Sequence, residues 1–197
     1  WPYTGGVTAP IDNPLRTTLD GPLADKADQL APRLARALGA EPDGETRFVA
    51  ALSDFAAGMI AQPGTWVAEG LEAGRFHQPP GRAEIEAGLA AELAGVEDMT
   101  GLQAALRLVR NRFQLWIVWR HLTGRAPLED TTGVLSDLAD VLIDGALDTL
   151  HGWLVEREGE PRDADGAPQR MVVLGLGKLG ARELNLSSDV DLIFAYP

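Results

Sequence analysis

One segment of the chain, from Thr100 to Leu122, constrains the fold more than any other. Its apolar residues recur at intervals of three and four, the spacing that places side chains on one face of an α-helix. Within its second half, the run Leu115–Trp119 is apolar on every side, and a helix of this kind is usually buried over most of its surface. The chain must therefore provide other elements that pack around it, which predicts a helical assembly.

Other segments extend this helical region. The leucines, the isoleucine and the tryptophan between Glu129 and Arg157 repeat at helical spacing and predict a second long helix. The stretch Glu45–Ala61 predicts one continuous helix with four large residues on its buried stripe: Phe48, Leu52, Phe55 and Met59. Residues 1–20 show little periodicity and are predicted to form a tail or loop.

The pattern changes after Glu158. Residues 159–170 are polar and rich in proline and glycine, which is typical of a loop. Met171–Leu174 and Val190–Tyr196 are short runs of β-forming residues, and Lys178–Leu184 between them suits a short helix. We therefore expect an α+β fold with a helical region over residues 21–158, a loop over 159–170, and the opening of an α/β unit over 171–197.

Composition narrows the range of functions. The net charge of −12 provides no general attraction toward nucleic acid or anionic membranes. The absence of cysteine excludes disulfides, thiolate zinc sites and cysteine nucleophiles, and agrees with a cytoplasmic location. No apolar run approaches the roughly 18 residues that a membrane span needs. Because the chain does not begin with Met and ends on an apolar run, we expect it to be a fragment of a longer protein.

The closing stretch contains a G-x-G-x-x-G pattern formed by Gly175, Gly177 and Gly180, which is found in dinucleotide-binding domains. Two features count against that interpretation. Only about eight residues separate the last glycine from Ser188, which is too few for the helix that joins two parallel strands. The acidic residue expected at the end of the second strand is also missing, because that strand ends in FAYP.

A different interpretation uses the whole stretch. Asp189 and Asp191 lie one residue apart on the predicted strand, so their carboxylates should share one face. Two like charges held this close are tolerated when a divalent cation lies between them and an anionic substrate. Gly177 and Lys178 open the predicted helix, where free N–H groups and the lysine charge would bind phosphate. Ser188 either bonds a phosphate or only shapes the turn. The pattern predicts phosphoryl or nucleotidyl transfer.

The stretch LGLGKLGARELNLSSDVDLIFAY, residues 174–196, resembles the signature of the bacterial glutamine synthetase adenylyltransferase/deadenylylase family, a branch of the DNA polymerase β-like nucleotidyltransferase superfamily. The pair Gly177-Lys178 matches the superfamily's Gly-Ser turn with lysine in place of serine. The pair Asp189 and Asp191 matches its metal-binding carboxylates. The stretches LRLVRNRFQLWIVWRHLTG and LEDTTGVLSDLADVLID resemble the helices that precede this signature. The family usually has a second glycine at the position of Ala181 and tends to have arginine at the position of Asn111.

The resemblance implies an Mg²⁺-dependent enzyme that acts on glutamine synthetase. The sequence ELNLSSDVDLIF resembles the family's amino-terminal unit more than its carboxyl-terminal unit. In the amino-terminal unit, phosphate attacks the AMP–tyrosine bond of adenylylated glutamine synthetase and releases ADP. Adenylylation with ATP is the alternative. The implied partners are glutamine synthetase, phosphate, ADP or ATP, and a PII-type signalling protein. The superfamily's third carboxylate lies on a later strand, so these residues alone are expected to be inactive. A dinucleotide-binding domain and a non-catalytic nucleotide-sensing module remain open.

The segment 99–125 holds five arginines and no acidic residue, which is unusual in an acidic chain. These arginines either form a positively charged surface that faces a nucleotide or a partner protein, or pair with acidic helices elsewhere in the chain. We favour pairing and leave them outside the candidate site. They are Arg107, Arg110, Arg112, Arg120 and Arg125.

Overall fold

The computed structural model describes residues 19–196, which divide into two compact units. Unit 1 contains the described residues up to Pro79 together with Val118–Pro127, and unit 2 contains Pro80–Ile117 and the residues from Leu128 on. One helix, α6 (Met99–Leu122), supplies residues to both units. All but the last two residues of the tail predicted over 1–20 lie outside the described residues.

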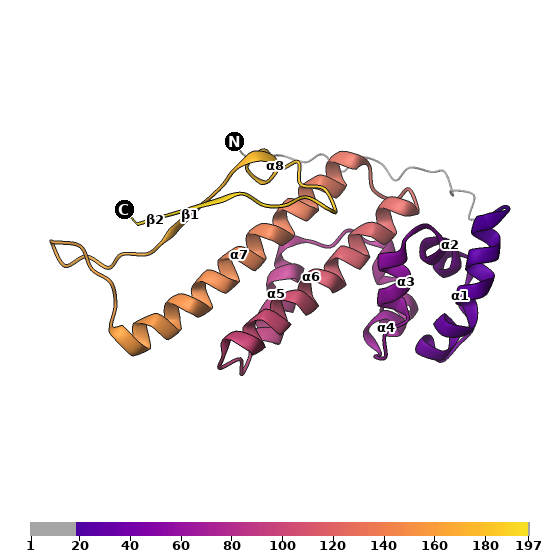
Figure 1. The fold of residues 1–197 in the computed structure, drawn as a ribbon, viewed down its shortest axis with the longest axis horizontal. Helices are drawn as coiled ribbons and strands as arrows, with labels where there is room; N and C mark the ends of the chain where they lie inside the picture. The colour runs from indigo at the N-terminus through magenta and orange to yellow at the C-terminus, as the bar shows by residue number, and fades with distance from the viewer. Residues whose placement is uncertain (1–18, 197) are drawn as a thin grey trace. The chain divides into compact units, whose positions relative to one another are not determined.

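Unit 1 is built from short helices around an apolar core. The helices are α1 (Pro22–Leu38), α2 (Gly44–Leu52), α3 (Asp54–Ile60), α4 (Trp66–Glu72) and the 3-10 turn η1 (Arg75–His77), shown in indigo and purple in Figure 1. Phe76 and Trp119 stack with their ring centroids 4.8 Å apart, and both side chains are almost completely buried. Leu34, Val49 and Ile60 are buried in the same unit.

The single helix predicted over Glu45–Ala61 is wrong, because the chain breaks at Ser53. This residue adopts an extended conformation, ends α2, and starts α3 by accepting a hydrogen bond from the Ala56 N–H at 3.2 Å. A serine hydroxyl offers the backbone a partner that competes with helix continuation. Leu52, the last residue of α2, is 39% exposed and does not belong to a buried stripe.

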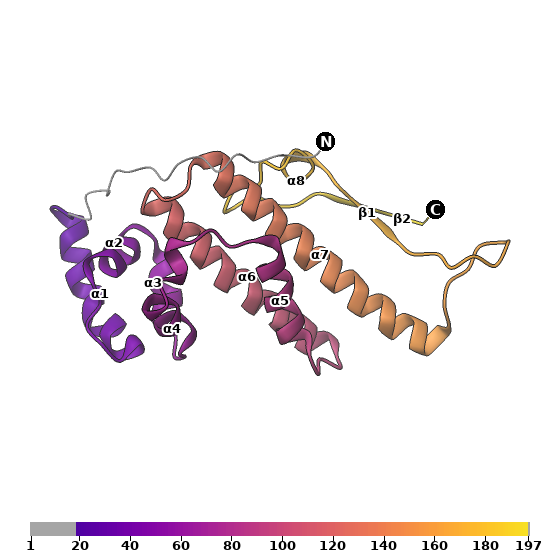
Figure 2. The ribbon, with the colours of Figure 1, turned by 180° about the vertical axis from the view of Figure 1, so that it is seen from behind.

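Unit 2 contains three of the longer helices and a small sheet. Its helices α5 (Arg82–Leu93) and α7 (Leu128–Glu158) pack on each other, and Figures 1 and 2 show α6 and α7 running side by side from opposite viewpoints. The two long helices predicted from periodicity are confirmed to within one residue at each end. The all-apolar run Leu115–Trp119 is buried throughout, as its composition predicted.

The apolar face of α7 is covered unevenly. Leu135, Leu138 and Val141 are buried, whereas Leu150, predicted to face inward as well, is 38% exposed. Periodicity identifies the apolar face of a helix but does not tell how far its neighbours extend along it. No helix within residues 19–196 is long and apolar enough to cross a membrane.

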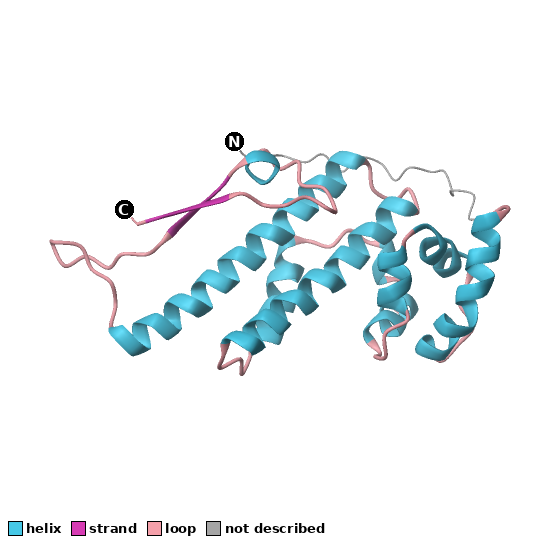
Figure 3. Cartoon of the chain, viewed as in Figure 1, coloured by secondary structure: helices cyan, strands magenta, loops and turns pink. Residues whose placement is uncertain are grey.

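The carboxyl-terminal part of unit 2 is a two-stranded antiparallel sheet made of β1 (Val172–Gly175) and β2 (Leu192–Ala195), joined by the one-turn helix α8 (Gly177–Gly180) and a loop. Figure 3 shows the two strands together with the loop that leads into them from α7. Gly175 pairs with Leu192, and Val172 pairs with Ala195. Together with the helices this is an α+β fold. The antiparallel pairing argues against the dinucleotide-binding alternative, because the strands of that motif run parallel.

Candidate functional site

The turn between β1 and α8 requires glycine because the backbone packs closely there. Gly177 has φ of +55°, a left-handed conformation that residues with a side chain rarely adopt. A Cβ atom on Gly180 would lie 2.5 Å from the carbonyl oxygen of Gly175. The first turn of α8 therefore lies against the end of β1 at a separation that only glycine permits, and the G-x-G-x-x-G pattern describes this turn.

Four of the five predicted site residues come together around this turn. The Nζ atom of Lys178 lies 3.3 Å from the Oγ atom of Ser188, on the far side of the loop. Asp191 extends the pairing of the strands, since its carbonyl oxygen accepts the Leu176 N–H at 2.9 Å. Its carboxylate lies over Gly177, with Oδ2 3.6 Å from the position that a Cβ atom would occupy there.

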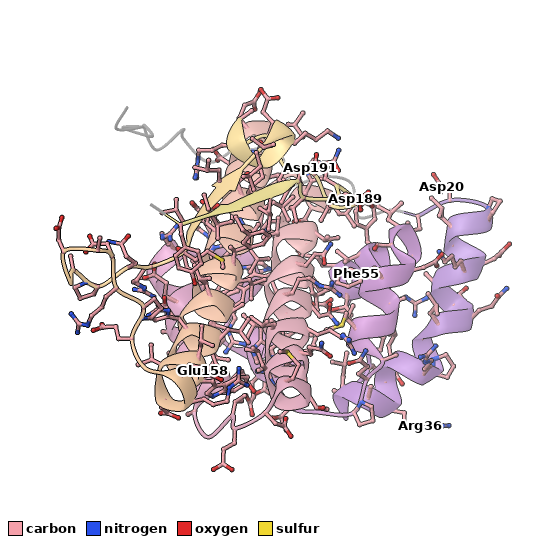
Figure 4. The ribbon with its side chains drawn as sticks, turned by 60° about the vertical axis from the view of Figure 1, so that its left-hand side comes forward. Asp20, Arg36, Phe55, Glu158, Asp189 and Asp191 are labelled. Carbon is pink, nitrogen blue, oxygen red and sulfur yellow. The ribbon has the colours of Figure 1, made fainter. Side chains whose placement is uncertain are left out.

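The two aspartates do not lie within the strand, so the prediction that strand alternation orients them is wrong. Both precede β2 in the segment that links the loop to the strand, as Figure 4 shows. The paired residues of the two strands begin at Leu192, and only the backbone hydrogen bond of Asp191 continues the pairing beyond them, so Asp189 lies outside it. Both residues are exposed.

One contact was not expected from the sequence. The Oγ atom of Ser188 donates to Asn185 Oδ1 at 2.6 Å, and the Asn185 N–H lies 3.4 Å from the same Oγ atom. Asparagine and serine have short side chains that commonly make local hydrogen bonds in turns, and their occurrence together in this loop was the available signal. The pair holds the loop that precedes Asp189.

The predicted helix over Lys178–Leu184 is shorter in the structure, and this changes the electrostatic argument. The helix α8 has a single turn, so it contributes little of the aligned dipole that a longer helix offers to an anion. Positive charge at this place comes from the Lys178 side chain, which is exposed. Phosphate contact would therefore depend on this ammonium group and on backbone N–H groups of the turn.

The residues present are of the kind that magnesium prefers. The carboxylates of Asp189 and Asp191 make no hydrogen bond or salt bridge with another described residue. Residues 19–196 contain no group of three or more acidic, histidine or cysteine side chains able to hold a metal. Mg²⁺ is commonly bound by one or two carboxylates together with water and substrate phosphates. The pair thus fits the protein's share of such a site.

The loop after α8 is anchored to α7. Leu184 is buried, and its N–H lies 3.4 Å from the Oγ atom of the fully buried Ser136. Arg182 donates from Nη2 to Asp137 Oδ1 at 2.7 Å, and this hydrogen bond raises the pKa of the guanidinium. Burial raises the pKa of the neighbouring Asp140, although two arginines lie close to it. Nothing in the local pattern of the sequence indicated these contacts.

Three of the five arginines in the segment 99–125 have structural partners. Arg112 pairs with Glu92 at 2.5 Å within unit 2, and Arg125 pairs with Glu45 at 2.8 Å within unit 1. Arg120 is 9% exposed and donates to two backbone carbonyl oxygens. The interpretation that these arginines pair with acidic residues is confirmed for Arg112 and Arg125, whereas Arg120 is bonded to backbone carbonyl oxygens instead. The other two are exposed on α6: Arg107 and Arg110.

Replacing Gly180 with alanine should disable this turn. The added methyl group would meet a backbone oxygen rather than a mobile side chain, so β1 and α8 must separate by about 1 Å to admit it. Overpacking of this kind typically costs about 1–3 kcal/mol, so thermal unfolding followed by circular dichroism should show a lower Tm. Ala181→Gly is the matched control, because this neighbouring residue is exposed and its loss opens no contact. A wild-type Tm in Gly180→Ala would contradict the packing argument.

Comparison with known proteins gives consistent matches. Residues 44–197 match the family model described as glutamate-ammonia ligase adenylyltransferase. The chain is 45% identical over 174 residues to a protein of Thioalkalivibrio sulfidiphilus, covering 88% of this chain and 18% of the relative. It is 48% identical over 152 residues to a protein of Pseudomonas aeruginosa, covering 77% and 16%. Both relatives are named bifunctional glutamine synthetase adenylyltransferase/adenylyl-removing enzyme. The chain thus spans less than a fifth of their length.

Proposed function

Because the chain belongs to the glutamate-ammonia ligase adenylyltransferase family, we propose that it carries part of an Mg²⁺-dependent nucleotidyltransferase site of the DNA polymerase β-like type. The proposed reaction of the whole protein is the removal of AMP from adenylylated glutamine synthetase. The names of the relatives combine an adenylyltransferase with an adenylyl-removing activity. The observation that carries the proposal is the turn at Gly177, over which the Asp191 carboxylate lies while Lys178 reaches Ser188.

The arrangement suits an anionic substrate beside a cation. Lys178 provides a positive charge at the exposed surface of the turn, and the absence of a side chain at Gly177 leaves room for phosphate oxygens next to the backbone. Asp189 and Asp191 would hold magnesium. When bound, the ion supplies charge neutralisation at the phosphate groups that react. Ser188 is held by Asn185 at the edge of this surface.

The proposed reaction is phosphorolysis. An oxygen of inorganic phosphate attacks the phosphorus of the AMP–tyrosine ester, the bond from that phosphorus to the tyrosine oxygen breaks, and the products are ADP and tyrosine once the phenolate has taken up a proton. Lys178 and the turn orient the two phosphate groups for this displacement. Similarity of ELNLSSDVDLIF to the amino-terminal unit of the family favours removal of AMP over its addition. A PII-type signalling protein is the proposed regulatory partner.

The test uses the whole translated reading frame that contains these residues. The protein is incubated with adenylylated glutamine synthetase, inorganic phosphate and Mg²⁺, and ADP is measured over time. ADP release that requires both phosphate and Mg²⁺ is the expected result. A parallel reaction with unmodified glutamine synthetase and ATP measures AMP incorporation. Incorporation without ADP release would replace the proposed direction by the opposite one, and the absence of both from a folded protein would favour a non-catalytic module.

A further inference from the structure

Arg182 has an unusual backbone conformation. Its φ of +59° makes it the one non-glycine residue with positive φ within residues 19–196. It follows α8 at the position where helices commonly end in glycine: its N–H donates to the Leu179 carbonyl at 3.0 Å, and the Glu183 N–H donates to the Lys178 carbonyl at 2.8 Å. A residue with a side chain is strained in this conformation, which glycine adopts freely. The Arg182 side chain must therefore make stabilising contacts that glycine could not make.

The side chain of Arg182 binds one face of α7. Its Nη2 atom donates to Asp137 at 2.7 Å and lies 3.4 Å from the Gly133 carbonyl oxygen, and its Nη1 atom lies 3.7 Å from Asp140. The three partners follow one another at intervals of four and three residues, which places them along one side of the helix. The guanidinium thus bridges successive turns of α7.

This contact is the first of three that attach the loop at alternate residues. Two residues on, the Leu184 N–H meets the buried Ser136 of α7, and two residues further the Leu186 carbonyl accepts from Gln114 of α6 at 3.0 Å. The site residues Ser188, Asp189 and Asp191 follow directly. Of the three attachments, that of Arg182 is the one that joins two opposite charges and contacts more than one turn of α7.

We propose that Arg182 is a positioning residue: through Asp137 and Asp140 it holds the segment Leu184–Asp191 on α7, and thereby places the two aspartates for cation binding. The proposal rests on the proposed function in treating these aspartates as cation ligands. It is not a catalytic role, because the contacts of the guanidinium are with α7 and not with the turn that would hold substrate.

The chain offers a matched control in Arg82. This residue lies at the start of α5 and faces the same acidic stripe, with its guanidinium 3.8 Å from Asp137 and 3.9 Å from Asp140. Arg82→Asn removes one positive charge from the same aspartates without touching the loop. Arg182→Asn removes the other charge, and asparagine tolerates the left-handed backbone at that position. Comparing the two variants therefore distinguishes the effect of removing a positive charge beside α7 from the effect of removing the contact between the loop and α7.

Two readouts test the proposal in the whole translated protein. Hydrogen exchange measures protection of the amides in Leu184–Asp191, and electron paramagnetic resonance of Mn²⁺ measures cation affinity without substrate. For Arg182→Asn we expect about fivefold faster exchange in this segment and an about tenfold higher dissociation constant for Mn²⁺. Asp137→Asn should act in the same direction, and combining it with Arg182→Asn should add little. Arg82→Asn should leave both quantities within twofold of wild type.

The outcomes separate this inference from the proposed function. Unchanged exchange in Arg182→Asn would overturn the inference, and so would faster exchange with unchanged Mn²⁺ affinity, since the contact would then be only structural. Absence of Mn²⁺ binding in the wild type would also overturn it. Failure of the proposed function is seen in a different measurement, the release of ADP from adenylylated glutamine synthetase. If the wild-type protein releases no ADP but Arg182→Asn still weakens Mn²⁺ binding, the proposed function fails and the inference about Arg182 stands.

Discussion

Replacing Asp191 with asparagine should lower the rate of ADP release by about a thousandfold and leave the stability of the protein unchanged. The amide keeps the size of the side chain but removes the negative charge that would hold a divalent cation. Such an ion contributes several kcal/mol to stabilising a phosphoryl-transfer transition state, and each 1.36 kcal/mol corresponds to a factor of ten in rate. The rate is measured as phosphate-dependent ADP release at saturating Mg²⁺.

Stability should not change, because the carboxylate is exposed and is not paired with a described residue. Substitutions at such positions usually alter the free energy of unfolding by less than about 0.5 kcal/mol. Asp189→Asn should behave in the same way. Asp165→Asn, in the exposed loop between α7 and β1, is the control and should retain full activity. Turnover within threefold of wild type in Asp191→Asn would show that the pair is not the cation site.

Replacing Glu45 with alanine should destabilise unit 1 by about 3 kcal/mol. The carboxylate is 18% exposed and has three partners: Trp119 Nε1 donates to Oε1 at 2.5 Å, Arg125 Nη2 donates to Oε2 at 2.8 Å, and His77 Nε2 lies 3.2 Å from Oε1. Its removal leaves a buried indole N–H without its acceptor, which costs about 1–3 kcal/mol, and breaks a partly exposed ion pair, which adds up to about 1 kcal/mol.

The change is measured by thermal unfolding followed by circular dichroism at 222 nm. A loss of 3 kcal/mol corresponds to a Tm lower by about 6–12 °C for a protein of this size. Glu45→Gln keeps an acceptor for the indole and should fall between alanine and wild type. Glu72→Ala, at an exposed position of α4, is the control and should change the Tm by about 1 °C or less. Equal Tm values for Glu45→Ala and Glu72→Ala would show that this cluster does not hold unit 1 together.

Much of the local structure follows from the sequence alone. The ends of α6 and α7 match their periodic patterns within one residue, and the apolar run Leu115–Trp119 is buried as composition predicted. The same reasoning selected Gly177, Lys178, Ser188 and Asp191, which the structure brings around one turn. These successes share a cause: a repeat of 3.6 residues, or a glycine that admits a close backbone contact, depends on neighbours only a few positions away.

Only the tertiary structure decided how distant segments meet. The strands β1 and β2 pair antiparallel, which their composition did not indicate, and that pairing argues against a dinucleotide-binding fold. Glu45 meets Trp119 across 74 residues, and Arg182 meets Asp137 across 45. A charged residue on an exposed face has the same local pattern whether it faces water or an opposite charge. Its partner is set by the packing of whole helices, and the sequence of one segment does not contain that information.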